Sequence, residues 1–340
     1  MSGRLDLRRG VVVSAEPLVV EVAGERRPAW ADQLLLGEMR EGDEVVVNVA
    51  ALDLDLGSGG FDVVHVNLTR GLDRGERGGE HVMKLNYTSL QHPVEPVEEV
   101  PRGPEGIRAH VPVLVLPLHG HLAPAAWAVA RAKPELKVGY VQTAGGALPG
   151  TFSRDVPALR ERGLLCGHIT AGPSHGGEHE ALSTLGALDA ACSRLCWDVI
   201  LVGPGPGIIG SETQFGHGGV VALETAQAAQ ALLLATTISP RLSEADPRER
   251  HRGLSHHTET VLGHLLGAVS VVAPDGFPEA RGWLELASEG RHHLYSAPAD
   301  LDGYAASGLP TRTMGRNLDE DRLFFAAPLA AGHGLVTWTE

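Results

Sequence analysis

The chain has 340 residues, 43% of them apolar and 21% charged, with a formal net charge of −14, the composition of a globular protein long enough for two domains. The negative charge and the lack of any Lys/Arg-rich block argue against nucleic acid or an anionic membrane as a partner, because both require a basic face. The sequence has neither an apolar run of about 18 residues nor an apolar secretory signal after Met1, so it predicts a cytoplasmic protein without a membrane span.

The first part of the chain consists of short β-type runs that are separated by Gly, Pro and acidic turns. The runs are residues 5–14, 18–22, 44–49, 61–68 and 81–87. Only residues 31–39 could supply a helix, and it would be short. Short strands at this spacing are typical of a small antiparallel β-barrel or sandwich, so we predict such a domain over residues 1–92.

A Pro- and Glu-rich segment follows over residues 93–110. Proline lacks the backbone donor that a helix interior or a central strand needs, and this segment contains four prolines among acidic residues. We therefore predict an interdomain linker here and a second domain over residues 111–340.

The second domain shows solid apolar runs that alternate with helical patterns. The predicted strands are residues 111–118, 137–143, 164–170, 197–203, 232–238 and 269–273. The predicted helices are residues 124–133, 153–162, 179–194, 220–231 and 255–267, with a closing helix over 319–331. Such alternation indicates a mostly parallel sheet with helices on both faces, which is a doubly wound α/β domain.

Glycine, histidine and other polar residues gather directly after the predicted strands. Five consecutive loops have this composition: residues 118–124, 143–149, 170–180, 203–219 and 241–258. The carboxyl ends of parallel strands lie at one edge of the sheet, and ligands bind outside that edge. We therefore expect the functional site to be built from these loops.

Four longer strings in the chain are distinctive. They are His-Val-Met-Lys-Leu-Asn-Tyr-Thr-Ser-Leu-Gln (81–91), Gly-Pro-Gly-Ile-Ile-Gly (205–210), Ala-Asp-Pro-Arg-Glu-Arg-His-Arg-Gly-Leu-Ser-His-His-Thr (245–258) and Met-Gly-Arg-Asn-Leu-Asp-Glu-Asp (314–321). Together they resemble a bacterial family of proteins of unknown function, and the resemblance covers nearly the whole chain. It implies that these loops are a family signature, and it implies no particular activity.

The loop after the fourth predicted strand contains glycines that could hold an anion. Gly205, Gly207 and Gly210 match the spacing of the dinucleotide fingerprint, in which backbone amides close on a pyrophosphate. Pro204 and Pro206 remove two of those amide donors, so a cradle for a small anion is favoured over a dinucleotide site, and a tight turn is the alternative. The predicted ligand-binding glycines are Gly145, Gly146, Gly203, Gly205, Gly207 and Gly210.

The loop after the fifth predicted strand carries the strongest signal for an anionic ligand. Ser255 can cap a helix whose first turn, at His256, presents free backbone amides. Arg250 and Arg252 add guanidinium groups that suit phosphate or carboxylate. Three acidic residues in the same segment nearly balance the arginines, so a structural network of arginines and carboxylates is an equally open interpretation.

Histidines after the first and third predicted strands could bind a metal ion. His175, Glu178 and His179 match the inverted zincin string, but the two glycines between the histidines oppose the helix that this site needs. A loop site assembled from His119, His121, His175 or His179 with Glu178 is the remaining metal hypothesis. The alternative is that these histidines only bond to backbone groups at turns.

These signals predict an enzyme, a hydrolase or group transferase, that acts on a small anionic or phosphorylated metabolite. His119 and His257 are the acid/base candidates, with Glu212 or Glu178 as the orienting carboxylate. Two alternatives stay open: a metal-dependent hydrolase with a His-rich site, and a non-enzymatic ligand-binding or assembly protein. The sequence identifies no cofactor, and a homodimer is the expected oligomer because it is the commonest one.

Overall fold

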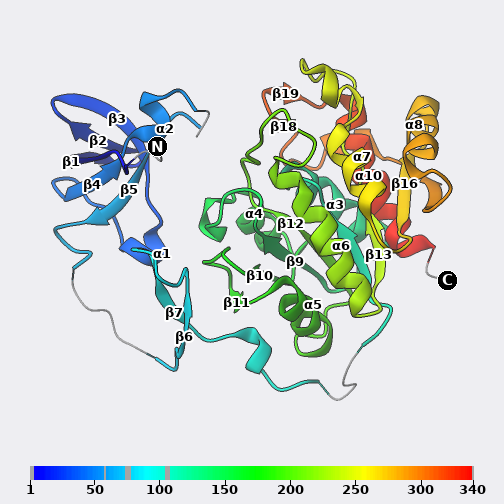
Figure 1. Ribbon diagram of the computed structural model, residues 1–340, viewed down its shortest axis with the longest axis horizontal. Coiled ribbons are helices and arrows are strands. Elements are labelled where there is room, and N and C mark those ends of the chain that lie inside the picture. The colour runs from blue at the N-terminus through cyan, green and yellow to red at the C-terminus, as the bar shows by residue number, and fades with distance from the viewer. Residues whose placement is uncertain (1–3, 57–58, 73–77, 104–107, 339–340) are drawn as a thin grey trace. The chain divides into compact units, whose positions relative to one another are not determined.

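The computed structural model describes residues 4–56, 59–72, 78–103 and 108–338. The chain divides into two compact units, the barrel unit Met1–Val94 and the α/β unit Glu95–Glu340 (Figure 1). Whether these units fold independently, as the predicted domains 1–92 and 111–340 require, stays a prediction.

The barrel unit contains a closed five-stranded barrel. Its strands are β1 (Leu7–Ala15), β2 (Leu18–Val22), β3 (Glu25–Trp30), β4 (Glu44–Asn48) and β5 (Asp62–Asn67), in the order β1-β2-β3-β5-β4. All neighbours pair antiparallel except β3 and β5, which pair in parallel. Alternate residues of β4 point inward, so that Val45 and Val47 are buried with Val12, Val20 and Val64. The predicted small β-barrel is confirmed.

The strand β3 was not predicted, because Arg26 and Arg27 make it polar. The structure explains why an arginine stands at position 27 in this strand: Arg27 Nε donates a hydrogen bond to the buried carboxylate of Asp62 on β5 at 2.6 Å. The remaining elements of this unit are α1 (Gln33–Leu36), α2 (Ala50–Asp53) and a two-stranded sheet of β6 (Val82–Lys84) and β7 (His92–Val94). The predicted helix over 31–39 is thus a single turn.

The α/β unit is built on eight strands, all of which pair in parallel. In spatial order they are β11 (His179–Ala181), β10 (Gly167–Ala171), β9 (Val138–Thr143), β12 (Val199–Pro204), β8 (Pro112–Val115), β13 (Ala235–Ile238), β16 (Ser270–Pro274) and β17 (His293–Ala297). Six of these correspond to the six predicted apolar runs. The predicted mostly parallel sheet is therefore confirmed.

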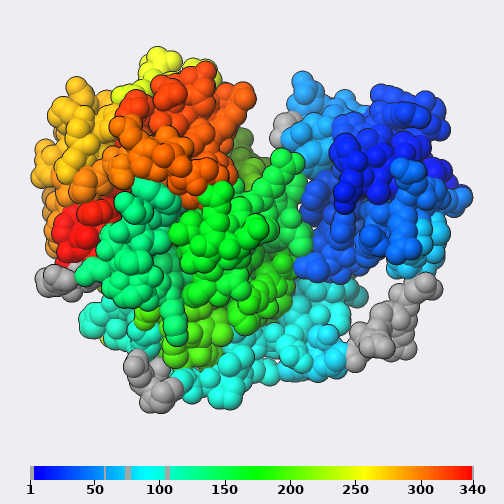
Figure 2. Space-filling model, turned by 180° about the vertical axis from the view of Figure 1, so that it is seen from behind, coloured from blue at the N-terminus to red at the C-terminus, as the bar shows by residue number. Residues whose placement is uncertain are grey.

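Helices cover both faces of this sheet. They are α3 (Leu122–Ala132), α4 (Asp155–Glu161), α5 (Thr184–Ser193), α6 (Val221–Ala231), α7 (His256–His264), α8 (Pro278–Ser288), α9 (Leu301–Ala305) and α10 (Arg322–Thr337). In β12, Val199 and Leu201 pack in the core with α3, α4, α9 and most of α10, whereas Ile200 and Val202 pack with α5 to α8. Figure 1 looks onto α5, α6 and α7, and Figure 2 shows the opposite face with α3, α4 and the orange and red C-terminal segment. Among the described residues, no helix is both long and apolar enough to cross a membrane.

The predicted helix over 179–194 is wrong in its first part. His179–Ala181 forms β11, which pairs in parallel with β10, and α5 begins only at Thr184. Ser183 sets this start, because its side chain accepts a hydrogen bond from the amide of Gly186. The elements α8, α9 and β17 were not predicted.

Part of the predicted linker packs on the α/β unit. The short helix η1 (Val97–Glu99) buries Val97 in the core beside α5. Arg102 Nη2 lies 3.2 Å from the carboxylate of Asp189 on α5. Residues 104–107 of this segment lie outside the described residues.

The strand order creates two crevices at the carboxyl edge of the sheet. The strands β8 and β13 are neighbours in the sheet, but the chain goes from β8 to β9 on one side of this pair and from β13 to β16 on the other side. The strands β9 and β12 are also neighbours, and the chain goes from β9 to β10 on one side and from β12 to β13 on the other. Loops that diverge from neighbouring strands leave room for a ligand, so the topology itself marks this edge as the place for a site.

Candidate functional site

A cavity of about 530 Å³, which we call the edge cavity, opens at the carboxyl edge of the sheet. Most of its wall comes from four segments: the loop after β8, the glycine loop after β12 (residues 205–219), the arginine loop after β13 (residues 239–255), and the hairpin of β18 (Arg312–Thr313) and β19 (Arg316–Asn317). Asp155 of α4, His257 of α7 and Phe325 of α10 also line it. The polar residues in its wall are His119, Asp155, Ser211, Arg241, Arg248, Arg250, His251, His257, Arg312 and Thr313. Its size suits a small-molecule ligand.

Two of the predicted glycines line the edge cavity and the others support its wall. Gly207 and Gly210 line it, and Gly207 has φ +70, a conformation that glycine adopts without strain. Beneath them the loop after β9 presses against the glycine loop, since the amide of Ala147 donates to the Pro206 carbonyl at 2.6 Å. Four glycines allow strands and loops to approach closely here without lining the cavity: Gly145, Gly146, Gly203 and Gly205.

The wall of the edge cavity contains more arginines than carboxylates. Arg241, Arg248, Arg250 and Arg312 line it, whereas Asp155 is the one carboxylate among its described lining residues. Burial raises the pKa of the Asp155 carboxyl, which favours its neutral form. Four guanidinium groups and one carboxyl group therefore line the cavity.

A buried ionic network holds the arginine loop behind this wall. Asp246 is fully buried and accepts hydrogen bonds from Arg248 Nε and Nη2, both at 2.9 Å. Arg241 Nη2 and Arg316 Nη2 lie 3.3 and 3.4 Å from the same carboxylate, and Arg316 Nε donates to Asp321 at 2.9 Å. Three arginines thus share two carboxylates, and one positive charge is left over.

The pKa values in this network follow from its contacts. Burial alone would raise the pKa of Asp246, but the hydrogen bonds from Arg248 and the charges of Arg248 and Arg241 hold it well below its usual range. Burial and the charge of Arg248 lower the pKa of Arg241 to about 10, so this guanidinium is still charged at neutral pH. The network of arginines and carboxylates that the sequence left open is therefore present in this loop, and Arg241 and Arg248 of this network also line the cavity.

Only one of the two predicted ligand-binding arginines lines the edge cavity. Arg250 lines the edge cavity, with Nη1 only 3.4 Å from the exposed carboxylate of Glu212. Arg252 does not line it, and its Nη2 lies 3.4 Å from the backbone carbonyl of Asp246. Ser255 caps α7 by accepting a hydrogen bond from the His257 amide at 3.3 Å, as the sequence predicts. Glu212 is 90% exposed in its side chain and orients neither His119 nor His257 by a hydrogen bond among the described contacts.

His119 lines the edge cavity with both ring nitrogens engaged. Nε2 lies 2.8 Å from the Ser153 hydroxyl and 3.6 Å from Asp155 Oδ2, and Nδ1 lies 3.4 Å from the Tyr140 hydroxyl. Burial lowers the pKa of His119 to about 4, although the backbone of Pro204 opposes this shift. The ring is therefore neutral, and Asp155 is its nearest carboxylate.

The third loop of the sheet edge lies apart from the edge cavity. Glu178 pairs with Arg160 at 2.9 Å, His179 begins β11, and the amide of His175 donates to the Leu148 carbonyl at 3.0 Å. None of the three lines the cavity. His121 is buried elsewhere, with Nδ1 2.9 Å from the Ser239 hydroxyl, and burial lowers its pKa to about 3.

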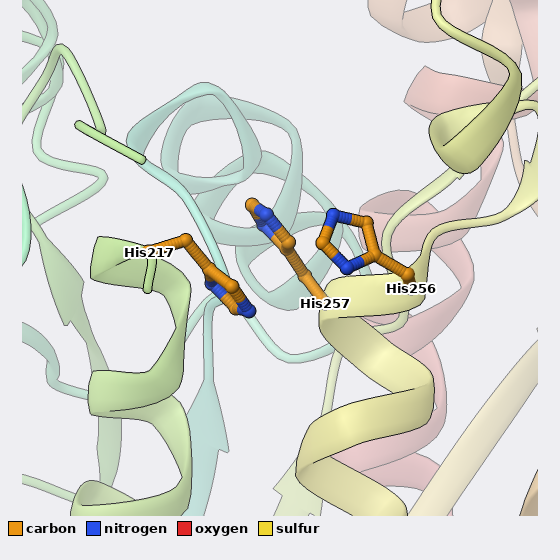
Figure 3. A group of neighbouring side chains, drawn as sticks. All are labelled: His217, His256 and His257. Atoms are coloured by element: carbon orange, nitrogen blue, oxygen red, sulfur yellow. The ribbon is translucent and has the colours of Figure 1, made fainter. Parts of the chain in front are cut away.

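A group of histidines lies against the edge cavity at the start of α7 (Figure 3). Within the part of the chain that the structure describes, His217, His256 and His257 are the one group of three potential metal ligands, with one ligand atom of each within 4.8 Å of the others. None of the predicted metal candidates belongs to it. Burial lowers the pKa of all three, for His257 to about 2; the backbone of Gln214 opposes the shift of His217. These rings are therefore neutral.

Several residues of the site were not singled out from the sequence. Arg241 lies three residues after the end of β13, in a loop that the sequence predicted to bind a ligand, and this position could have identified it. Asp155 and Arg312 reach the cavity from the start of α4 and from the C-terminal hairpin, far from the other lining residues in the chain. His217 comes from η4's N-cap in the glycine loop, and no spacing links it to the doublet of His256 and His257.

Comparison with known proteins agrees with the resemblance that the sequence strings carry. A model of the family described as "Protein of unknown function (DUF3866)" matches residues 28–332, which include all the residues of the edge cavity. No curated protein and no solved structure matches the chain. Because the match covers most of its length, the chain belongs to the DUF3866 family.

Proposed function

We propose that the α/β unit binds a small anionic metabolite, such as a phosphorylated compound or a carboxylate, in the edge cavity and acts on it as a hydrolase or group transferase. The observation that carries the binding is the charge of the wall. Four guanidinium groups face one carboxyl group whose pKa is raised by burial. Guanidinium groups bind phosphate and carboxylate in bidentate fashion, so an anion satisfies this wall better than water does.

Arg250 and Arg312 are the proposed anion ligands. Arg241 and Arg248 are already held by Asp246, whereas Arg250 has only an exposed partner in Glu212 and Arg312 Nη2 lies 3.4 Å from the carbonyl of Gly315. These two guanidinium groups come from different loops and line the same cavity. The glycine loop at Gly207 and Gly210 adds backbone to the same wall.

Asp155 and His119 support proton transfer as the chemistry. The two groups lie 3.6 Å apart in the wall, and burial raises the pKa of the Asp155 carboxyl while it lowers that of His119. Titratable groups whose pKa values are shifted toward one another can exchange a proton during a reaction. This pair replaces the predicted orienting carboxylates Glu178 and Glu212 in the proposal.

A thermal-shift panel tests the binding. Metal-free protein is heated with phosphate, pyrophosphate, sulfate or citrate, each compared with sodium chloride of equal ionic strength. A ligand at 100 times its dissociation constant stabilises the fold by about 2.7 kcal/mol, which raises the melting temperature measurably. If none of these anions raises the melting temperature above that of the chloride control, the proposal is overturned.

Turnover is tested separately. Anions and their phosphate or carboxylate esters that stabilise the protein are incubated with it, and products are measured by phosphorus NMR or mass spectrometry. Conversion that Asp155→Asn reduces by about 100-fold or more is the result expected for an acid/base group. Binding without conversion would support the non-enzymatic ligand-binding protein in place of the enzyme.

A further inference from the structure

The histidine group beside the edge cavity contains several buried ring nitrogens. His217 is 7% exposed, and neither of its ring nitrogens makes a hydrogen bond of good geometry within the described residues; the same holds for Nε2 of His256. A buried polar group that makes no hydrogen bond destabilises the folded protein. Native proteins rarely carry three such atoms together unless a water molecule or an ion satisfies them.

The backbone at Gly219 leaves a space between two of these rings. A Cβ atom at this position would lie 2.9 Å from His257 Nδ1 and 3.1 Å from His217 Nδ1. Any other residue would therefore crowd both rings at their Nδ1 atoms. Gly219 lies in η4 (Gly218–Val220), and its backbone does not need positive φ, so packing is the reason for glycine here.

The three ligand atoms are close to the spacing that a metal ion requires. They lie within 4.8 Å of one another, whereas zinc–nitrogen bonds of about 2.0–2.1 Å in a tetrahedral site bring ligands somewhat closer together. The rings of His217 and His257 are stacked, with centroids 3.6 Å apart and planes 5° from parallel, so one ring has to turn to share an ion (Figure 3). His217 is the ring that we expect to turn, because the ring torsion of histidine is soft and neither of its nitrogens makes a hydrogen bond of good geometry with the described residues.

We propose that His217, His256 and His257 bind a divalent transition-metal ion of the zinc class. Imidazole nitrogen is the ligand that zinc, cobalt, nickel and copper ions prefer, and three histidines leave one coordination position for water or a ligand. His257 lines the edge cavity, so that position is next to the proposed anion site. The inference goes beyond the proposed function, because the metal site needs no anion to exist.

The surrounding charges predict how the ion binds. Arg241 Nη1 lies 3.3 Å from His257 Nδ1, and the charges of Arg248 and Arg250 also act on His256. Positive groups oppose a cation, whereas an anion in the edge cavity offsets them. Metal affinity is therefore expected to rise when sulfate is present.

Cobalt(II) titration of the full-length, EDTA-treated protein tests the proposal, because the visible absorption of bound cobalt reports its coordination. We expect one equivalent to bind with the spectrum of a four-coordinate ion, to be displaced by zinc, and to bind more tightly in sulfate than in chloride. His217→Gln, His256→Gln and His257→Gln should each weaken binding by about tenfold or more.

Gly219→Ala is the sharpest variant, because it keeps all three histidines and fills the space between them. It should weaken cobalt binding as the histidine variants do. Two substitutions on α7 are the controls and should leave binding within about twofold: His264→Gln, whose ring is exposed, and Gly263→Ala, where a Cβ meets nothing within 4 Å. Far-UV circular dichroism shows whether each variant is folded.

Two results would overturn the metal site. The first is that no spectrum of bound cobalt appears at millimolar cobalt. The second is that the Gly219→Ala and His256→Gln variants, both folded, bind cobalt with wild-type affinity. Neither result bears on the anion site, because the anion panel uses metal-free protein.

Discussion

Asp246 binds Arg248 through both of its carboxylate oxygens, each 2.9 Å from a guanidinium nitrogen. This pair lies in the middle of the arginine loop, behind the wall of the edge cavity, and it ties Arg248 to the buried Arg241. The same carboxylate therefore holds the loop in shape and aligns two of the four arginines that face the cavity. The loop therefore has a structural role besides the binding role that we propose for it, and mutation can test the two separately.

Asp246→Asn should destabilise the protein. The substitution leaves the buried charge of Arg241 without its compensating carboxylate, and breaking a buried ion pair in this way costs about 3 kcal/mol or more. Urea unfolding measures the change. Glu212→Gln is the control, because its carboxylate is 90% exposed and its pair with Arg250 should contribute less than about 0.5 kcal/mol. Equal effects of the two substitutions would contradict the structural role of Asp246.

Gly146→Ala should also destabilise the fold. Its Cβ would lie 2.1 Å from the backbone oxygen of Gly205, so the loops after β9 and β12 would have to separate. Such overpacking costs about 1–3 kcal/mol. Gly282→Ala on the exposed side of α8 is the matched substitution: nothing lies within 4 Å of its Cβ, and it should instead stabilise the helix by about 0.5–1 kcal/mol. Thermal unfolding of both variants checks the opposite signs.

Stability should fall in acid because of buried histidines. Burial lowers the pKa of His168 to about 3 and that of His119 to about 4, against about 6.5 in the unfolded chain. As the pH falls below 6.5, the unfolded chain gains protons that the folded protein does not, so the free energy of unfolding decreases. Each such histidine contributes up to about 1.4 kcal/mol per pH unit until its folded pKa is reached.

His168→Gln should reduce this slope by the share of one histidine between about pH 6 and pH 4. Urea unfolding at intervals of one pH unit measures it. The prediction fails if the variant and the wild type lose stability in parallel over that range.

The α/β unit should fold without the barrel unit, because each unit has hydrophobic clusters of its own. A fragment of residues 95–340 should keep a cooperative thermal transition. A fragment of residues 111–340, which begins at the predicted domain boundary, should be less stable by about 2 kcal/mol, because it lacks the buried Val97. Failure of the longer fragment to fold would contradict the division into two domains.

Much of the architecture could be predicted because the parallel strands are continuous apolar runs. Strands such as 199–204 are buried on both faces, and strands of a parallel sheet that helices cover on both sides are typically continuous apolar runs. Two of the strands that escaped prediction, β3 and β11, did so for local reasons. Arg27 in β3 is paired with Asp62, and β11 is three residues long and pairs with one neighbour only.

The candidate site could be predicted only as far as the loops. The rule that ligands bind at the carboxyl ends of the strands points to the edge at which the cavity opens, but strand order decides which loops meet there. His121 and His175 follow predicted strands as His119 does, yet the structure places only His119 in the wall of the cavity. Arg312 joins that wall from a hairpin near the C-terminus, a contact that no local pattern encodes.

Calorimetric titration of metal-free protein with pyrophosphate tests the central claim most directly, since it compares arginines inside and outside the edge cavity. Wild-type protein should bind one equivalent, and Arg250→Ala and Arg312→Ala should each weaken binding by about 10-fold or more, the loss expected for a charge-assisted hydrogen bond. Arg281→Ala, which removes the same charge from the exposed pair with Glu285 on α8, should leave the affinity within about twofold. Equal weakening by all three substitutions would show a non-specific effect of net charge, and no binding at all would contradict an anion site in the edge cavity.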